Sequence, residues 1–327
     1  MDPIPFSLCG IPLSVACEDP RQADQIVRLW KQTFAIERAC SAAASPAVRI
    51  RFQRERGPSA PAEFIEEVSR SDALTVSRTR NGFSLECGGS SLDLDLTADC
   101  ALGVLHEDFW AHSLSEQREF FLLCFLMLLR RFEAFGLHAN CVVKANRGFL
   151  IVGPSGAGKT TLTIALVREG WRFVADDALV LRAGDGDLEA FALRRGLSCT
   201  AETAELFPEL RTAIAEGRDL ADGKRLVGID STYRGRSISR CTPRVLAFPQ
   251  VTREPRTEIA PLEATEAMTA LLEQSPGILT DRSGVERQLA ALRQLMQQSR
   301  CVRVRLGSDV FASTGLVTSL LERIESA

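Results

Sequence analysis

The segment Gly153–Thr160 constrains this chain more than any other. It reads Gly-Pro-Ser-Gly-Ala-Gly-Lys-Thr and fits the phosphate-binding loop pattern in full. The apolar run Phe149–Val152 before it predicts a buried strand, and Leu162–Glu169 after it predicts a helix that ends at Gly170. This strand, loop and helix predict an α/β protein whose loop receives phosphate groups; the alternative is a glycine-rich turn that binds nothing.

Each residue type in the loop has a chemical reason. Glycines let the backbone bend so that successive N–H groups, with the positive end of the following helix, point at phosphate oxygens. Lys159 adds a charge for the β and γ phosphates, and the Thr160 hydroxyl is placed to ligate Mg²⁺. Thr161 is placed for an α-phosphate contact. The predicted nucleotide-binding residues are therefore Gly153, Pro154, Ser155, Gly156, Ala157, Gly158, Lys159, Thr160 and Thr161.

Two adjacent carboxylates, Asp176 and Asp177, follow the predicted strand Trp171–Ala175. In a parallel sheet with short connections, the carboxyl end of this strand would face the bound nucleotide. One carboxylate there can hold Mg²⁺, and the other can accept a proton from an incoming hydroxyl. Adjacent strand residues point to opposite faces, so we expect the two to differ in role. The alternative is a solvated strand end in which aspartate forms a turn.

His138 stands at the start of another predicted strand, Ala139–Val143. Its imidazole could donate a hydrogen bond or shuttle a proton at the phosphate site. A lone histidine at a strand edge is also a common structural residue, and its position in the sequence leaves both interpretations open.

Composition limits the rest of the chain. The 327 residues carry 39 Lys and Arg against 42 Asp and Glu, a net charge of −3, which does not favour a nucleic-acid-binding protein. The longest unbroken apolar run, Phe120–Leu129, is far shorter than the ~20 residues that a membrane helix needs. The ten cysteines include no Cys-x-x-Cys pair, and the first residues do not have the pattern of a secretory signal. We therefore expect a cytoplasmic protein with reduced thiols.

The chain is long enough for two domains. Segments 48–53, 82–87 and 91–96 have strand patterns and 21–36 a helical one, which predicts a small α+β domain over residues 1–112. A helix over 113–135 is then expected to open a second domain, residues 113–327, that carries the phosphate loop.

These segments resemble a known family. His138, the stretch Gly148–Thr160 and the stretch Arg168–Asp177, with its Val-Ala-Asp-Asp ending, are similar to the bacterial HPr kinase/phosphorylase family. The resemblance implies a kinase domain related to phosphoenolpyruvate carboxykinase, ATP with Mg²⁺, and transfer to a serine or threonine hydroxyl of a protein. It also implies that His138 and Asp177 lie in the active site, with Asp177 as proton acceptor, and that Thr160 binds Mg²⁺. This leaves Asp176 as the carboxylate of the pair that we expect to hold Mg²⁺ beside Thr160.

The chain departs from this family in one signature. The family has Glu-Ile-Arg-Gly-Leu-Gly, whose glutamate helps hold the metal, and here Leu193 stands in its place within Leu193–Ser198. An active-site arginine of the family is matched only by Arg256. We therefore expect a divergent member, similar to HPr-kinase-like peptide kinases, and leave phosphorylase activity open.

The resulting hypothesis is an ATP- and Mg²⁺-dependent kinase that transfers the γ-phosphoryl group to a Ser/Thr hydroxyl of a protein or peptide, with Asp177, Asp176, His138 and Lys159 as catalytic residues. The alternatives are an ATPase or nucleotide switch without an acceptor, and a small-molecule kinase. Four arginines form a basic cluster in the sequence: Arg234, Arg236, Arg240 and Arg244. Such a cluster could bind an acidic partner, because guanidinium groups suit carboxylates and phosphates. The alternative is a solvated face. The resemblance also leaves a homo-oligomer open.

Overall fold

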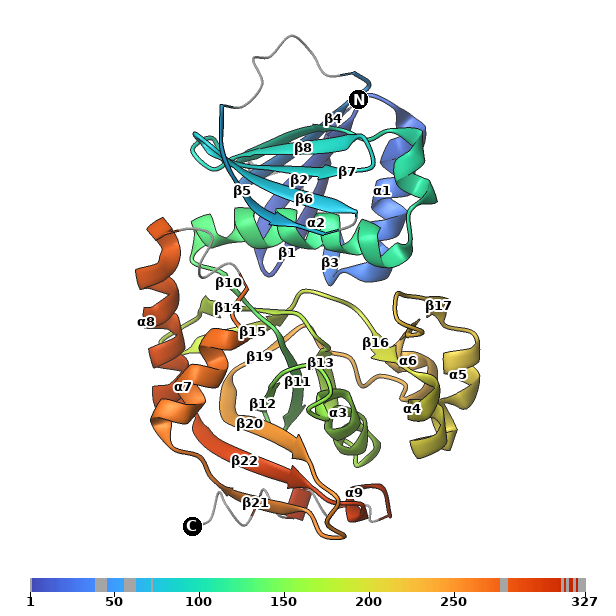
Figure 1. The fold of residues 1–327 in the computed structure, drawn as a ribbon, viewed down its shortest axis with the longest axis vertical. Helices are drawn as coiled ribbons and strands as arrows, with labels where there is room; N and C mark the ends of the chain where they lie inside the picture. The colour runs from blue at the N-terminus through green and yellow to red at the C-terminus, as the bar shows by residue number, and fades with distance from the viewer. Residues whose placement is uncertain are drawn as a thin grey trace. The chain divides into compact units, whose positions relative to one another are not determined.

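The computed structural model describes residues 2–38, 46–55, 63–71, 73–276 and 282–312, together with 315, 318, 319 and 322 (Figure 1). It is a mixed α/β structure with several sheets, which confirms the predicted α/β class. The chain divides into two compact units, Met1–Phe132 and Glu133–Ala327. Among the helices that the structure describes, none combines the length and the apolar character needed to span a membrane.

The first unit is built on one mixed sheet. Its strands are β1 (Ile4–Leu8), β2 (Ile11–Cys17), β3 (Ile36–Arg38), β4 (Val48–Gln53), β5 (Phe64–Arg70), β6 (Leu74–Thr79), β7 (Gly82–Cys87), β8 (Ser90–Asp95) and β9 (Cys100–Val104). Within the described residues they pair in the order β3-β1-β2-β4-β9-β8-β7-β6-β5. The predicted strands over 48–53 and 82–87 are confirmed as β4 and β7, and the one over 91–96 as β8, which begins one residue earlier.

Helices α1 (Pro20–Thr33) and α2 (Leu114–Leu129) complete this unit, with a short 3-10 turn at Glu107–Ala111. Ser113 begins α2 with a capping box, because its hydroxyl accepts from the Glu116 N–H while the Glu116 carboxylate accepts from the Ser113 N–H. Helix α2, most of whose side chains are buried, packs on β7, β8 and α1.

This packing accounts for the division of the units between Phe132 and Glu133. The predicted division lay after residue 112 instead, at the start of α2. The ring of Phe121 on α2 lies 5.3 Å from that of Trp30 on α1 and 6.2 Å from that of Phe52 on β4. Phe125 lies 5.0 Å from Phe34. Since these rings are buried together, α2 belongs to the core of the first unit.

The second unit holds the predicted site on a sheet whose strands are β11 (Ala139–Lys144), β12 (Arg147–Val152), β13 (Arg172–Ala175), β20 (Pro243–Val251), β21 (Glu258–Pro261) and β22 (Arg300–Leu306). In the described part of the chain their order is β13-β11-β12-β20-β22-β21. Strands β12, β20 and β22 are parallel neighbours. Helix α3 (Lys159–Arg168) follows β12, and its buried side chains join the core of this sheet.

The arrangement of the strand before the acid pair differs from the expected parallel sheet. Strand β11 lies between β12 and β13 and is antiparallel to both. The cause is local, because Ala145 and Asn146 adopt positive φ angles of 49° and 63° and close a tight hairpin from β11 to β12. Strands β12 and β13 still end at the same edge, since each runs opposite to β11.

Two smaller sheets lie in the second unit besides the six-stranded sheet. One, of order β10-β14-β15-β19, contains a hairpin around Gly184–Gly186; the other has the order β16-β18-β17. Their strands are β10 (Phe135–Leu137), β14 (Leu179–Ala183), β15 (Leu188–Ala192), β16 (Leu197–Cys199), β17 (Arg218–Asp219), β18 (Arg225–Val227) and β19 (Arg240–Cys241). The further helices are α4 (Ala201–Leu206), α5 (Arg211–Ala215), α6 (Ile229–Thr232), α7 (Ala264–Glu273), α8 (Arg282–Gln298) and α9 (Asp309–Ala312), with 3-10 turns at Arg130–Phe132 and Pro208–Leu210.

The aromatic core of the first unit yields a stability prediction. Replacing Phe121 by alanine should lower the free energy of unfolding by about 3–5 kcal/mol, because a buried ring is lost and a cavity remains. Phe64→Ala is the matched control, since that ring is 62% exposed, and should change it by less than about 0.5 kcal/mol. Urea denaturation followed by tryptophan fluorescence measures both, and equal effects would contradict the assignment of α2 to this core.

Candidate functional site

The glycine-rich loop connects the end of β12 to the start of α3. Gly156 and Gly158 have φ angles of 82° and 95°, the left-handed region that glycine adopts without strain. Gly158 caps α3 without a side chain, so the N–H groups of the first turn have no side-chain acceptor there. A Cβ added at Gly156 would meet nothing within 4 Å, so the bend of the loop is open. These are the properties that a phosphate cradle needs.

Lys159 is buried at the start of α3, with 5% of its surface exposed. Its Nζ donates to the carbonyl oxygens of Gly153, at 2.9 Å, and Pro154, at 3.1 Å. Burial lowers the pKa of Lys159, and the nearby carboxylates Asp177 and Asp176 oppose that shift. Since carbonyl groups carry no net charge, an anion at the loop would stabilise this ammonium further.

Asp176 lies directly after β13 and is only 2% exposed. Its Oδ1 accepts hydrogen bonds from the Asn140 side-chain amide at 2.7 Å and from the Thr160 hydroxyl at 3.3 Å. Its Oδ2 accepts from the backbone N–H of Ser198 at 2.7 Å. The first acid of the pair is therefore joined to the first turn of α3, as its position after the strand predicted.

Burial raises the pKa of Asp176 from 3.8 to about 7, and the charge of Asp177 adds to the increase. Hydrogen bonds from Ser198, Asn140 and Thr160 act in the opposite direction, because they stabilise the charged form. The carboxyl therefore exchanges its proton near neutral pH, where a metal ion or a cationic group can displace it.

The side chain of Asp177 lies beside His138. Its φ angle of 62° is unusual for a non-glycine residue, and its Oδ1 lies 3.7 Å from Nε2 of His138. Burial lowers the pKa of His138, as do the charges of Lys159 and Arg194, while Asp177 opposes them. The imidazole is therefore mostly neutral at pH 7 and can exchange a proton with a neighbouring group.

The oxygen atoms of Thr160 and Asp176 suit Mg²⁺, which takes one or two protein oxygens together with phosphate oxygens and water. The residues that the structure describes contain no group of three His, Cys, Asp or Glu side chains that could hold a metal alone. The fit is thus to a metal that arrives with a phosphate group. Thr161 is half-buried on the same turn.

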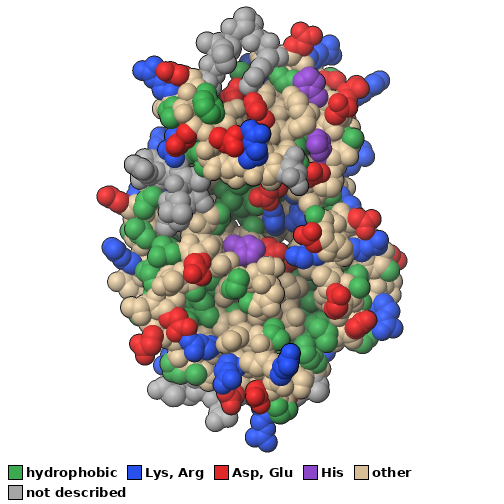
Figure 2. Space-filling view, viewed as in Figure 1, with side chains coloured by type: hydrophobic (Ala, Val, Ile, Leu, Met, Phe, Trp, Pro, Cys, Tyr) green, Lys and Arg blue, Asp and Glu red, His purple; other side chains and the backbone are tan. Residues whose placement is uncertain are grey.

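The basic cluster is engaged within the chain. Arg236 donates to the carbonyl of Gly170, Arg240 lies 3.3 Å from Glu189, and Arg244 lies 2.6 Å from Asp187. Arg234 is exposed and, within the described residues, is the member of the four without such a contact. The cluster therefore supports the solvated-face interpretation better than an acidic partner. On the face drawn in Figure 2, basic and acidic side chains are likewise interspersed.

Two residues at which the chain departs from the family pattern are Leu193 and Arg256. Leu193, at the position of the missing glutamate, is fully buried, and its side chain has no polar atom that could ligate a metal. Arg256 lies in the loop after β20, and its backbone packs against Gly307 beyond the end of β22. Its side chain is exposed.

Sequence reasoning missed Asn140, Thr163 and the N–H group of Ser198. Asn140 is fully buried and contacts both acids: its amide donates to Asp176, and its oxygen accepts from the N–H of Asp177 at 3.0 Å. The available signal was a single amide side chain within the apolar run 139–143 of β11.

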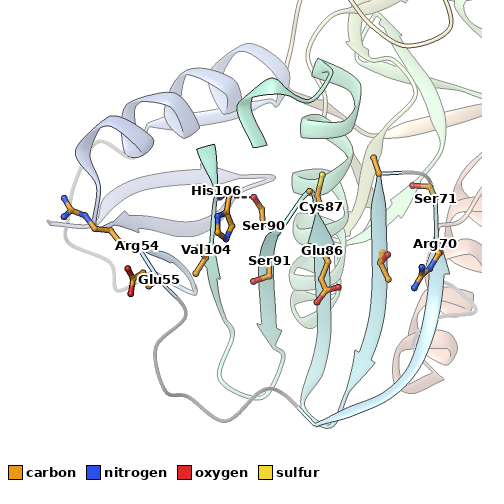
Figure 3. Close-up of a pocket in the computed structure, with 14 residues that line it drawn as sticks. Arg54, Glu55, Arg70, Ser71, Glu86, Cys87, Ser90, Ser91, Val104 and His106 are labelled. Atoms are coloured by element: carbon orange, nitrogen blue, oxygen red, sulfur yellow. Dashed lines mark hydrogen bonds between the residues drawn. The ribbon is translucent and has the colours of Figure 1, made fainter. Parts of the chain in front are cut away.

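A separate pocket of about 540 Å³ lies in the first unit, at one end of the strands β6 to β9 (Figure 3). Charged side chains of both signs line it, including Arg54, Glu55, Arg70 and Glu86, with Ser91 on a central strand. None of the residues predicted for the phosphate site lines this pocket. Its chemistry is therefore distinct from that of the glycine-rich loop.

The pKa of Asp176 predicts how stability depends on pH. Because the folded-state pKa, about 7, exceeds the ordinary value of 3.8, the folded protein holds a proton that the unfolded chain has lost between these values. Asp176 therefore contributes most to stability below about pH 4, and this contribution declines until about pH 7. The melting temperature of Asp176→Asn minus that of the wild type should rise from pH 5 to pH 8.

Asp222→Asn is the matched control, because Asp222 stands in an exposed turn with a φ angle of 58°. A rise of the same size in this control would show that the loss of any one carboxylate produces the effect. A constant or falling difference for Asp176→Asn would contradict the assignment.

Comparison with known proteins finds a similarity over part of the chain. No family model matches. The chain is 34% identical over 103 residues to the HPr kinase/phosphorylase of Caldanaerobacter subterraneus subsp. tengcongensis, which covers 31% of this chain and 30% of that protein. The chain thus spans under a third of the length of this curated relative.

A solved structure, the HPr(Ser) kinase/phosphatase from Coxiella burnetii, is similar with a TM-score of 0.30 and 14% identity, covering 58% of this chain and 96% of that chain. The sequence match confirms the predicted resemblance: the chain is a divergent sequence similar to HPr kinase/phosphorylase.

Proposed function

We propose that the protein is an ATP- and Mg²⁺-dependent kinase that transfers the γ-phosphoryl group to a Ser or Thr hydroxyl of a protein or peptide. The observation that carries the proposal is the contact of 3.3 Å between Thr160 and Asp176, which joins the glycine-rich loop to the acid pair. A phosphate loop alone serves many functions. A loop with a metal-binding carboxylate beside it, and a second carboxylate next to that one, suits phosphoryl transfer.

The loop residues have distinct tasks in this proposal. The N–H groups of the loop and of the first turn of α3 surround the phosphates; the loop contributes those of Gly153, Ser155, Gly156, Ala157 and Gly158. Pro154 has no N–H and shapes the loop only. Lys159 turns from its carbonyl partners to the β and γ phosphates. Thr161 contacts the α-phosphate. Thr160 and Asp176 would hold Mg²⁺, which would neutralise charge on the β and γ oxygens.

Asp177 accepts the proton of the acceptor hydroxyl. As that oxygen bonds to the γ-phosphorus, the bond from phosphorus to the β–γ bridging oxygen breaks and ADP leaves with the electron pair. His138, whose Nε2 lies 3.7 Å from Asp177, takes that proton from the Asp177 carboxyl at an unprotonated Nε2 and passes a proton on to water. Most of the rate enhancement then comes from positioning and charge neutralisation.

The curated relative is named for HPr, so purified HPr is one acceptor to test. A mixture of Ser/Thr-bearing peptides is the other, because the match covers less than a third of that relative. An ATPase or nucleotide switch would release phosphate to water without labelling either acceptor, and a small-molecule kinase would label neither but consume a metabolite.

Substitution of the two central residues separates binding from chemistry. Asp177→Asn should reduce phosphate transfer from labelled ATP by about 10²–10⁴-fold while nucleotide binding persists, because only proton transfer is lost. Lys159→Ala should weaken both. The matched control is Asp222→Asn, an aspartate with a similar left-handed backbone, which should transfer at the wild-type rate.

Radiolabel on the acceptor and free phosphate are measured in the same samples. Wild-type release of free phosphate with no label on HPr or on any peptide would contradict the kinase proposal in favour of the ATPase alternative. Undiminished transfer by Asp177→Asn would remove Asp177 from its assigned role.

A further inference from the structure

Asn140 on β11 links the two carboxylates to the first turn of α3. Its side-chain nitrogen donates to Oδ1 of Asp176 at 2.7 Å and to Oγ1 of Thr163 at 3.0 Å. Its side-chain oxygen accepts from the N–H of Asp177 at 3.0 Å. Asn140 and Thr163 are both fully buried. All of these groups lie in the second unit.

The chemistry of its partners fixes which way the amide points. The backbone N–H of Asp177 can only donate, so the amide oxygen must face it. The Thr163 hydroxyl donates to the carbonyl of Lys159 at 2.9 Å, which leaves its oxygen as an acceptor for the amide nitrogen. A flipped amide would set oxygen against the Asp176 carboxylate and NH₂ against N–H, so this orientation is the favourable one.

This network separates the two carboxylates. The Asp177 N–H is held by Asn140, and a turn hydrogen bond from the Ala178 N–H to the Asp176 carbonyl, at 2.8 Å, closes the bend. Asp177 thereby takes its left-handed φ of 62°. The Asp176 carboxylate faces Thr160 and Ser198, while that of Asp177 faces His138.

We infer that Asn140 is the positioning residue that assigns different tasks to Asp176 and Asp177, and that it does so in register with the phosphate loop through Thr163 and the Lys159 carbonyl. This inference rests on the proposed function. Asn140 contacts neither the phosphates nor the acceptor; it acts through the acids. Without its amide, Asp176 loses a donor to its charged form and Asp177 loses the constraint on its backbone.

The direct test is the titration of Asp176 followed by ¹³C carboxyl NMR, with Asp176→Asn used to assign the signal. In Asn140→Leu the pKa of Asp176 should rise by about one unit or more, because a hydrogen bond to a charged group is lost. Asn140→Ser, whose hydroxyl can restore part of the contact, should give a smaller rise. Thr163→Val should give a rise too, since the amide is then held less firmly.

Thr33→Val in the first unit is the matched control for Thr163→Val. Both hydroxyls are fully buried on a helix and donate to the carbonyl four residues earlier, at 2.6 Å for Thr33. Thr33→Val should leave the titration of Asp176 unchanged. Because Thr33→Val also removes a buried hydroxyl, it shares any general loss of stability. A changed titration of Asp176 in Thr163→Val alone therefore indicates that Thr163 helps to position the acid.

Transfer kinetics provide the second measurement. In Asn140→Leu, kcat should fall about a hundredfold, while the Kd for ATP measured with EDTA stays within about threefold. An unchanged titration of Asp176 together with unchanged kcat overturns the inference, and so does a loss of metal-free ATP binding as large as the loss of kcat. If the wild type transfers no phosphate, the proposed function fails, and the NMR titration still decides the role of Asn140.

Discussion

The burial of the Asp176 carboxylate beside the first turn of α3 is the constraint on which the candidate site depends. A buried carboxylate is costly unless it is hydrogen-bonded, and here three donors from three different elements converge on it: Asn140 on β11, Thr160 on α3 and the N–H of Ser198 on β16. This group therefore fixes the relative positions of strand, helix and small sheet. The negative charge of the buried Asp176 carboxylate destabilises this arrangement, and the metal of a metal–phosphate complex would stabilise that charge.

Unusual backbone conformations gather at this site. Gly156 and Gly158 use the left-handed region at no steric cost, whereas Asp177 occupies it as an aspartate. Such strain persists only where surrounding contacts hold it. For Asp177 the contact is the Asn140 oxygen, so the geometry of the acid pair and the location of the amide are one feature of the fold.

The sequence allowed the loop and the acid pair to be predicted because their chemistry restricts the residue types at each position. Glycines at positive φ, a lysine at the helix start and aspartates at a strand end are recognisable locally. The contacts of Asn140 were not predictable, since they depend on the register of β11 against β13, which is shifted between Cys141 and Val142. The role of the basic cluster was open for the same reason: Glu189 and Asp187 reach Arg240 and Arg244 only after β14, β15 and β19 pair. The boundary between the units could not be predicted either, because it depends on the packing of α2 on α1.

The most direct test of this account is a crystal structure with Mn²⁺ and a non-hydrolysable ATP analogue, in which anomalous scattering locates the metal. The account predicts phosphates on the N–H groups of residues 156 to 160 and Mn²⁺ at ligating distance from the Thr160 hydroxyl, beside Asp176, with the terminal phosphate facing Asp177. Phosphates bound away from the glycine-rich loop, or a metal remote from Thr160 and Asp176, would contradict it.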